Sequence, residues 1–567
     1  MYIGKSVLAS CFIAASVLAA PQPGWTLYTP NTSTSTFLID LQGVVQHQWA
    51  STYRPGQAVY LMNNGSLLRT ANDLAVAGFQ AGGRGGRLQK IAWDGSLQWN
   101  YLLADANKRQ HHDACLLPNG NVLAIVWEKK TTAEAIAAGH NPATLGAGEV
   151  WSEGLYEIQP SGATGGVVVW EWHVWDHLVQ NFDATKPNFA AASSRPERVD
   201  VNFGVVSNNA DWLHMNGVAY NAALDQIVVS IHNLNEIWVI SHAPGATGDL
   251  IYRWGNPAAY GMGTAANQKL FGQHNVHWID EGLPGAGNLL VYNNGLNRPA
   301  GAFSSVEEIT PPLQANGTYS RTSGTAFAPA ASTWTCEFAS GVRFYSPNIS
   351  GAQRLANGNT LMCVGASGQF IEVDPNSLTV WGFSSGSGTF RATRIQSCDT
   401  RLAGRLFTAT TISSQPQSSA GCADTVATFN TVVAGTNACT YEWQCRNSLA
   451  ADWTPLINGA NVISGELLLT ASGATTASIT VSRSPGWIES LELRCVVSDG
   501  CTTLTSNLAS LIICRADVNC DEIVDFFDYL DFVDLFSENS LEADFNQDGI
   551  VDFFDYLDFV DAFSVGC

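Results

Sequence analysis

The feature of this sequence that most constrains its fold is an internal repeat, in which two short units alternate between residues 37 and 383. The first unit is a strand, a turn and a second strand that ends in Trp. Its copies occupy residues 39–49, 93–99, 157–170, 238–254, 306–334 and 372–381. A repeat at this spacing indicates stacked copies of one supersecondary unit.

The second unit is an Asn-Gly or similar turn followed by an apolar strand. Its copies occupy residues 64–68, 119–123, 225–229, 287–290 and 357–361, with a weaker last copy at 405–407. An Asn-Gly turn beside alternating apolar residues is a hairpin signal. Two hairpins per repeat make four strands, which is one blade of a propeller. The sequence therefore predicts an all-β fold with a six-bladed β-propeller over residues 20–410.

Acidic charge separates the end of the chain from the rest. The chain has 27 Lys and Arg residues against 49 Asp and Glu residues, a formal net charge of −22. Residues 515–567 hold 15 of those acidic residues and a single Arg. Nucleic-acid binding needs a basic face and none is visible, so we expect no nucleic-acid partner.

The first 19 residues predict a signal peptide. Lys5 supplies the positive start, and the apolar run over residues 7–18 is too short to span a membrane. Small residues precede a cut after Ala19, and no later stretch reaches membrane-spanning length. We expect an exported protein without a membrane span, in the periplasm, at the cell surface or outside the cell.

Residues 408–419 read as a Ser/Thr/Gln-rich linker, and residues 420–514 predict a small β-sandwich. Strand-like runs lie at 425–429 and 491–497, and Trp443 resembles the core Trp of immunoglobulin-like domains. Six cysteines crowd this segment and suggest disulfide bonds of undetermined pairing: Cys422, Cys439, Cys445, Cys495, Cys501 and Cys514.

Residues 515–567 form a tandem repeat with a period of 27, in which 517–528 matches 544–555 and a helical pattern follows each copy. Oxygen ligands at loop positions 1, 3, 5, 9 and 12 suit calcium. The first loop offers Asp517, Asn519, Asp521, Asp525 and Asp528, and the second offers Asp544, Asn546, Asp548, Asp552 and Asp555.

These loops resemble a dockerin of the kind that ends in Gly-Cys, as Gly566-Cys567 does, although Glu522 replaces the usual Gly of the first loop. The resemblance implies a small helical module with calcium as its cofactor. It also implies attachment to a cell-surface or scaffold partner.

All eleven histidines lie between His47 and His277. Alignment of the repeats on their second hairpins places His112, His214 and His274 at one repeat position. Because equivalent positions of a propeller meet around its axis, we expect these imidazoles at one central mouth. They could hold zinc or copper, or carry out group transfer with one neutral imidazole as nucleophile. Imidazoles near a pKa of about 6.5 could divide neutral and protonated roles at mild pH.

Four motifs resemble those of the arylsulfate sulfotransferases. They are Asp-Trp-Leu-His-Met-Asn at 211–216, Gly-Gln-His-Asn at 272–275, His-His-Asp at 111–113 before Leu-Pro-Asn-Gly-Asn at 117–121, and Phe-Tyr-Ser-Pro at 344–347. The resemblance covers about residues 25–410. It implies a six-bladed propeller that moves a sulfuryl group from a phenolic sulfate donor to a phenol acceptor. No nucleotide cofactor is implied.

By this resemblance, His274 matches the histidine that is transiently sulfated. His112 and His214 match histidines that bind sulfuryl oxygens or assist proton transfer, and Asn216 matches a donor-binding Asn. Three alternatives remain open at this point: the transferase, a non-catalytic ligand-binding propeller on the same scaffold, and a metal-dependent propeller enzyme.

One departure from the family pattern concerns the strand at 227–230, after which His232 replaces the family Arg. A guanidinium suits sulfate oxygens bidentately, whereas an imidazole does so only when protonated. His232 is a further catalytic candidate, because an imidazole can act on protons near the sulfate. Its replacement of the family Arg is also the feature that favours the non-catalytic, ligand-binding alternative. His111 is a candidate substrate-binding residue, since either His111 or His112 could face the pocket.

Overall fold

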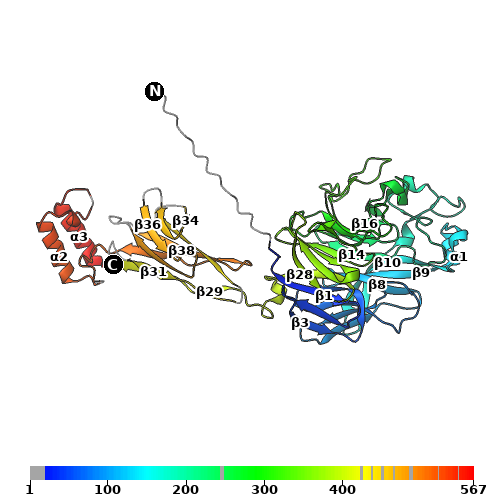
Figure 1. The fold of residues 1–567 in the computed structure, drawn as a ribbon, viewed down its shortest axis with the longest axis horizontal. Coiled ribbons are helices and arrows are strands. Elements are labelled where there is room, and N and C mark those ends of the chain that lie inside the picture. Colours follow the sequence, from blue (N-terminus) through cyan, green and yellow to red (C-terminus); the bar gives the residue numbers. More distant parts are fainter. Residues whose placement is uncertain are drawn as a thin grey trace, which may run out of the picture. The chain divides into compact units, whose positions relative to one another are not determined.

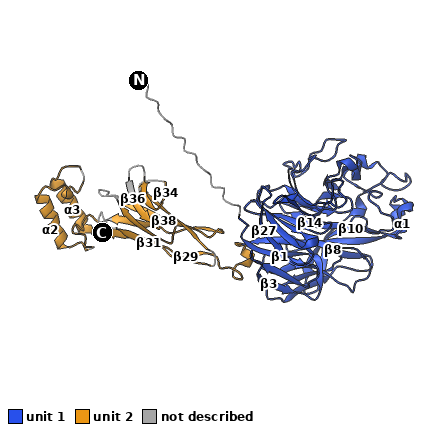
Figure 2. Ribbon diagram, viewed as in Figure 1, with its two compact units in different colours: residues 1–396 blue, residues 397–567 orange. Residues whose placement is uncertain are grey.

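The computed structural model describes residues 20–242, 248–421, 426–435, 438–447, 452–463, 467–483, 490–521, 523–546 and 548–566. The predicted signal peptide, Cys422, Glu522 and Cys567 lie outside these residues. The chain divides into two compact units, residues 1–396 and residues 397–567 (Figure 2). We refer to them as unit 1 and unit 2.

The described part of unit 1 contains six four-stranded antiparallel sheets (Figure 1). The first is made of β28 (Thr389–Gln396), β1 (Gly24–Pro30), β2 (Ser35–Ile39) and β3 (Val45–Ala50). The second is made of β4 (Arg54–Leu61), β5 (Leu67–Asn72), β6 (Gly86–Ile91) and β7 (Leu97–Leu102). The third is made of β8 (Lys108–Leu116), β9 (Val122–Thr131), β10 (Glu149–Ser161) and β11 (Gly165–His173).

The other three sheets follow in chain order. The fourth is made of β14 (Met215–Asn221), β15 (Gln226–Ile231), β16 (Glu236–Ser241) and β17 (Leu250–Trp254). The fifth is made of β18 (His274–Trp278), β19 (Leu289–Asn293), β20 (Ser305–Ile309) and β21 (Trp334–Cys336). The sixth is made of β24 (Gly351–Arg354), β25 (Thr360–Val364), β26 (Gln369–Val373) and β27 (Thr379–Ser384).

Short elements decorate these sheets. They are α1 (Thr132–Ala137), the pair β12 (Leu178–Val179) and β13 (Val199–Asp200), and the pair β22 (Phe338–Ala339) and β23 (Val342–Arg343).

One strand at the edge of each sheet lies toward the centre of unit 1. In cyclic order β4 contacts β8, β8 contacts β14, β14 contacts β18, β18 contacts β24, β24 contacts β28, and β28 returns to β4. A residue on any of these six strands can therefore approach residues that are far away in sequence.

The predicted hairpins of unit 1 are present, with one correction. Gly65, Gly120 and Gly358 of the Asn-Gly turns take left-handed φ angles of 74°, 86° and 87°, which glycine adopts without strain. The weak copy predicted at 405–407 forms no strand, and β28 fills that place by pairing with β1. This pairing joins the two ends of unit 1, so no local turn marks it in the sequence.

Unit 2 begins with two sheets that share one core around Trp443, which is fully buried and donates its indole N–H to the carbonyl oxygen of Thr476 at 2.9 Å. One sheet contains β30 (Ser419–Gly421), β40 (Ala509–Ile513), β38 (Leu491–Ser498), β33 (Thr440–Asn447), β34 (Thr454–Pro455) and β39 (Thr503–Thr505). The other contains β31 (Ala427–Asn430), β37 (Ser478–Arg483), β36 (Leu467–Ser472) and β35 (Gly459–Ile463).

Two features of this region differ from the sequence prediction. β29 (Thr411–Ser414) lies inside the predicted linker and pairs with β32 (Val432–Ala434). Cys501 forms a disulfide bond with Cys398, which lies outside the predicted group of six cysteines. Both contacts join residues that are distant in sequence, so composition alone could not reveal them.

The chain ends in two helices, α2 (Phe526–Ser537) and α3 (Phe553–Val565), that follow the 27-residue repeat. Phe532 and Phe559 are equivalent in the repeat and stack with ring centroids 3.9 Å apart. Tyr529 and Tyr556 are also equivalent, and their hydroxyl oxygens lie 2.9 Å apart. Among the described residues, no helix has the length and apolar character that a membrane crossing requires.

Candidate active site

Four histidines line one cavity of about 450 Å³ in unit 1, namely His112, His214, His232 and His274. Their rings follow one another around it. The ring centroids of His112 and His214 are 4.6 Å apart, those of His214 and His232 are 5.2 Å apart, and those of His232 and His274 are 5.5 Å apart. The structure thus brings together all four predicted catalytic residues, which come from three different sheets.

Irregular backbone aims these rings at the cavity. The pairing of β8 with β9 is interrupted between Gln110 and Ala114, and that of β18 with β19 between His274 and His277. His112 and His214 have φ angles of 47° and 53°, which non-glycine residues rarely adopt. Bulges of this kind re-aim side chains near functional sites.

His274 has its Nδ1 between two oxygen atoms, the carbonyl of Gly272 at 3.1 Å and Oδ1 of Asn294 at 2.8 Å. The Asn294 amide is held in this orientation, because its Nδ2 donates to the carbonyl oxygens of Ser346 and Ile349 at 2.9 and 2.8 Å. Nδ1 must therefore carry the proton, which leaves a lone pair on Nε2. Burial, reinforced by His232, lowers the pKa of His274 well below its usual range, so this ring is neutral.

His111 lies behind His112 and does not line the cavity. It is completely buried and stacks on Trp127, with ring centroids 3.8 Å apart. Its Nδ1 lies 2.9 Å from Nδ1 of His112, and its Nε2 lies 2.7 Å from Oε2 of Glu153. Oε1 of Glu153 accepts a hydrogen bond from the backbone N–H of Met215 at 2.9 Å. Of the two adjacent histidines, His112 is the one that faces the cavity.

This buried chain determines where His112 carries its proton. Burial raises the pKa of Glu153 and lowers that of His111, so the pair has no net charge. A pair without net charge has one proton between Glu153 and Nε2 of His111, whichever of the two atoms carries it. The second proton of His111 is then on Nδ1, and this N–H donates a hydrogen bond to Nδ1 of His112. Burial also lowers the pKa of His112. His112 is therefore neutral and presents an N–H donor at Nε2.

His214 is the cavity histidine with a carboxylate partner. Its Nδ1 lies 2.5 Å from Oδ2 of Asp211, and Oδ1 of Asp211 accepts the indole N–H of Trp127 at 3.1 Å. A carboxylate in this position fixes the tautomer and stabilises an imidazolium, as in a catalytic triad.

His232 has its Nδ1 2.8 Å from Oδ1 of Asn233. The amide nitrogen of Asn233 donates to the backbone carbonyl of Asp211 at 2.9 Å, so Oδ1 accepts the proton of His232 and Nε2 is left with a lone pair. Burial, together with His214, lowers the pKa of His232 to about 4. Three of the four rings are thus neutral at mild pH, which corrects the expectation that they titrate near pH 6.5.

Asn216 is fully buried and does not line the cavity. Its amide nitrogen donates to the backbone carbonyl of Gln273 at 2.8 Å, next to His274. Its Oδ1 has no hydrogen-bond partner among the described residues.

A model of the arylsulfotransferase (ASST) family matches residues 17–400. The chain belongs to the arylsulfotransferase family. No curated protein matches it.

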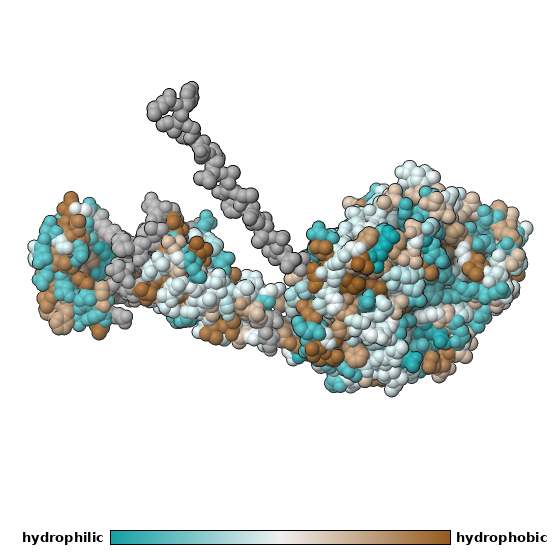
Figure 3. Space-filling model, viewed as in Figure 1, coloured by the Kyte–Doolittle hydropathy of each residue, from teal (hydrophilic) through white to brown (hydrophobic). Residues whose placement is uncertain are grey.

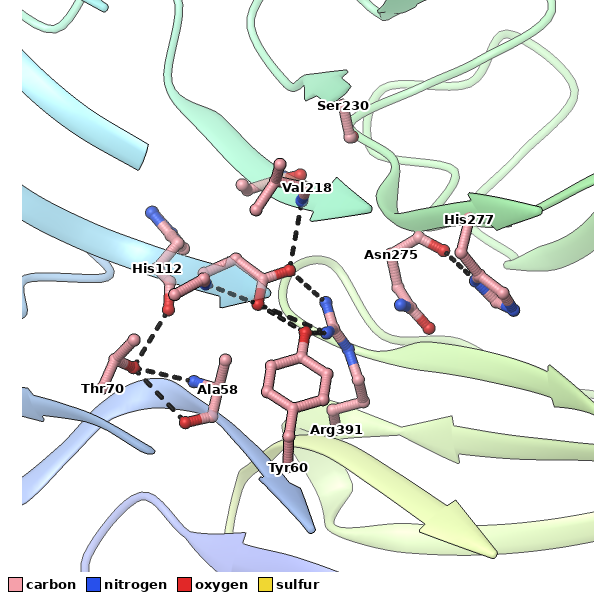
Figure 4. Close-up of polar contacts among 12 residues, drawn as sticks. Ala58, Tyr60, Thr70, His112, Val218, Ser230, Asn275, His277 and Arg391 are labelled. Carbon is pink, nitrogen blue, oxygen red and sulfur yellow. Dashed lines mark hydrogen bonds and ion pairs between the residues drawn. The ribbon is translucent and has the colours of Figure 1, made fainter. Parts of the chain in front are cut away.

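A buried ion pair between Asp113 and Arg391 supports the strand that carries His112 in the arylsulfotransferase cavity. Asp113, the residue after His112, lies 3.0 Å from a guanidinium nitrogen of Arg391 and accepts the hydroxyl of Tyr60 at 2.6 Å. It also accepts the backbone N–H of Val218 at 3.2 Å (Figure 4). These contacts connect β8 to β4, β14 and β28, and thereby fix the backbone that carries His112.

The supporting residues of the arylsulfotransferase site were not predicted from sequence. Glu153 lies 42 positions from His111, and Asn294 lies 20 positions from His274. No local pattern marks either residue. Two other supporting residues do lie close in sequence, since Asp211 precedes His214 by three residues and Asn233 directly follows His232.

The predicted calcium ligands lie in the two loops at residues 517–528 and 544–555 of the acidic tail. In the part of the chain that the structure describes, no three His, Cys, Asp or Glu side chains are grouped as a metal site. The first and last predicted ligands of each loop are nevertheless buried, namely Asp517, Asp528, Asp544 and Asp555. Each of these carboxylates accepts backbone N–H groups of its own loop, so burial by itself does not require a metal. The predicted donor set consists of oxygen atoms alone, which is the kind that suits a hard cation.

Proposed function

We propose that this protein is an aryl-sulfate sulfotransferase that transfers a sulfuryl group from a phenolic sulfate ester to a phenol, with the six sheets of unit 1 acting as blades of one propeller. The intermediate is a sulfohistidine at His274, and no nucleotide donor takes part. The observation that carries the proposal is the lone pair on Nε2 of His274, placed in a cavity with three other imidazoles.

In the first step, Nε2 of His274 attacks the sulfur of the donor. A nitrogen–sulfur bond forms, and the bond from sulfur to the phenolic oxygen breaks with its electron pair on the oxygen. His214, in its doubly protonated form supported by Asp211, gives a proton to this phenolate. The Nε2–H of His112 donates a hydrogen bond to a sulfuryl oxygen.

In the second step, the oxygen of the acceptor phenol attacks the sulfur and the nitrogen–sulfur bond breaks, which restores His274. Nε2 of His232 takes the proton of the phenol. The ring of His232 then lies next to His214, with centroids 5.2 Å apart, so the proton can return to His214 through the cavity. A neutral imidazole in place of the family Arg thus acts as a base.

The test is incubation of the purified protein with a chromogenic aryl sulfate, with and without a phenol acceptor. We expect phenol release that rises with acceptor concentration and is abolished in His274→Ala. His277→Ala is the matched control, because His277 lies on the same strand but does not line the cavity. If the wild-type protein cleaves no aryl sulfate, or if His274→Ala retains full activity, the proposal is wrong.

A non-catalytic ligand-binding protein is the second candidate, and His232 favours it. With the pKa of His232 at about 4, this position provides no cation for sulfate oxygens at neutral pH. This candidate predicts that an aryl sulfate binds in calorimetry without being cleaved.

We further propose that the protein is exported and that its dockerin-like tail binds two calcium ions and a cell-surface or scaffold partner. Phe526, Phe527, Phe553 and Phe554 are all more than 60% exposed at the starts of the two helices, and hydrophobic patches are visible on this tail (Figure 3). Apolar side chains presented in pairs suit a protein partner.

Calcium titration of the full chain should show two sites, and Asp528→Asn with Asp555→Asn should remove both. Absence of binding at millimolar calcium would overturn this assignment.

A further inference from the structure

A second cavity, of about 210 Å³, lies beside the histidine cavity. The two cavities share four lining residues, which are Asn31, Gln57, Gly82 and Gly83. Arg54 and Arg84 line the second cavity and not the first. A molecule bound at the histidines can therefore extend toward two arginines.

Two of the four residues shared by the cavities are glycines, Gly82 and Gly83. A Cβ atom at Gly83, whose φ is 75°, would overlap the ring of His112, and a Cβ at Gly82 would lie 3.9 Å from Cε1 of His214. The backbone N–H of His112 also donates to the carbonyl of Gly83 at 2.7 Å. Because Gly83 has no side chain, the ring of His112 packs directly on its backbone, where both cavities meet.

The second cavity also supplies two guanidinium groups, which do not line the first. Burial keeps His112, His232 and His274 neutral at mild pH. Among the described residues, no Asp or Glu lines either cavity, whereas Arg54 and Arg84 line the second one, and a guanidinium is a permanent cation. In a protein with a net charge of −22, two arginines in a carboxylate-free pocket are a local exception.

Arg84 is held in place by its neighbours. Its guanidinium donates to the side-chain oxygen of Gln80, and its backbone pairs with that of His111. Arg54 begins β4 and is exposed at the cavity rim. A carboxylate or sulfate between them would receive charge-assisted hydrogen bonds.

We propose that the Arg54–Arg84 cavity is a subsite for a second anionic group, and that the preferred aromatic donor or acceptor carries a carboxylate or a second sulfate besides its reacting oxygen. This rests on the proposed sulfuryl transfer at His274. The subsite would select aromatic substrates that have a second anionic group on the ring.

The test compares 3- and 4-carboxyphenyl sulfates with their methyl esters as donors, in the wild-type protein and in Arg54→Gln/Arg84→Gln. Arg87→Gln is the control, because Arg87 is paired with Asp73 at 2.6 Å and lines neither cavity. We expect a carboxylate to raise kcat/KM about tenfold over its ester, a preference worth one charge-assisted hydrogen bond. The double variant should lose this preference, and Arg87→Gln should keep it.

Equal rates for acid and ester in the wild-type protein would overturn the subsite, as would a preference that survives in the double variant. Calorimetry with 4-hydroxybenzoate and its methyl ester separates this failure from that of the proposed function. If no donor is cleaved, tighter binding of the acid that is lost in the double variant still supports the subsite. Equal binding of acid and ester contradicts it.

Discussion

The four cavity histidines differ in their chemistry because each has a different partner at its second nitrogen. The side-chain oxygens of Asn294 and Asn233 accept the Nδ1–H groups of His274 and His232. Both Nε2 atoms are therefore unprotonated and have a free lone pair. The Glu153–His111 chain gives His112 the opposite tautomer, with an N–H toward the cavity. In the proposed mechanism, one residue type thus supplies a nucleophile, a base and a hydrogen-bond donor.

Glu153 tests the tautomer of His112. Glu153→Gln should retain activity within about threefold, because its amide N–H can donate to His111 as the neutral acid does. Glu153→Leu removes this donor and should lower kcat by about 10²-fold through loss of one oxyanion donor, with little change in KM. Circular dichroism checks that both variants fold. If Glu153→Gln is as inactive as Glu153→Leu, a negative carboxylate is required and our assignment is wrong.

His232 tests the identity of the base. His232→Asn should slow transfer to phenols with a pKa near 10 by about 10²- to 10⁴-fold, which is the usual contribution of a general base. Acidic phenols, which are already ionised at pH 8, should react at an unchanged rate. Transfer rates measured over a series of phenols give this comparison directly. A uniform loss across the series would show that His232 binds the donor instead.

The sequence could predict the histidines and not their partners. His112, His214 and His274 share a position in a visible repeat, and His232 stands out beside a predicted strand. Asn294 and Glu153 act through contacts made only after the sheets close around a centre. Burial then lowers pKa values that the sequence placed near their ordinary range.

At the level of elements, the central strands are connected by the Asp113–Arg391 pair. Asp113 is 1% exposed and Arg391 is 7% exposed, so removal of one partner leaves a buried charge. Burial acts against the charged form of Arg391, but Asp113 and Tyr60 outweigh it and raise its pKa above the ordinary value.

Asp113→Ala should therefore reduce the free energy of unfolding by about 3–5 kcal/mol. Glu197→Ala is the control, because the Arg195–Glu197 pair is 43% and 34% exposed and contributes about 1 kcal/mol or less. Urea unfolding followed by tryptophan fluorescence gives both values. Similar losses in the two variants would mean that the buried pair does not hold the central strands together.

The local hairpins were predictable because their turns carry their own signal, as Asn119-Gly120 does between β8 and β9. The closing strand was not, because β28 pairs with β1 across almost the whole of unit 1. The strand β29 was not predicted for a different reason, since its sequence Thr-Ile-Ser-Ser contains a single apolar residue and has the polar composition of a linker.

For the whole molecule, the neutral cavity histidines predict that stability falls in mild acid. Below about pH 6.5 the unfolded chain binds protons that the folded His112, His232 and His274 do not, so stability is lost as pH falls. Groups with raised pKa values act in the opposite sense, namely Glu153, His173, Asp200 and Glu236. They are outnumbered by the histidines with lowered pKa values, which also include His47, His111, His140 and His277. Each such histidine costs about 1.4 kcal/mol per pH unit in this range.

The urea midpoint should accordingly fall between pH 7.5 and pH 5.5. His232→Asn should reduce the slope, because it removes one group that stays neutral down to a pKa of about 4. A midpoint that rises in acid, or a variant with an unchanged slope, would contradict the assignment of neutral histidines.

The central claim for the whole protein is covalent transfer through His274. The most direct measurement is mass spectrometry of peptides after rapid quenching of the protein with an aryl sulfate and no acceptor, at alkaline pH where a sulfohistidine survives. We predict a peptide spanning residue 274 that is heavier by one SO₃ group, that disappears when a phenol is added before quenching, and that is absent in His274→Ala. Turnover of the aryl sulfate without any such peptide, or with the added mass on another residue, would contradict the account.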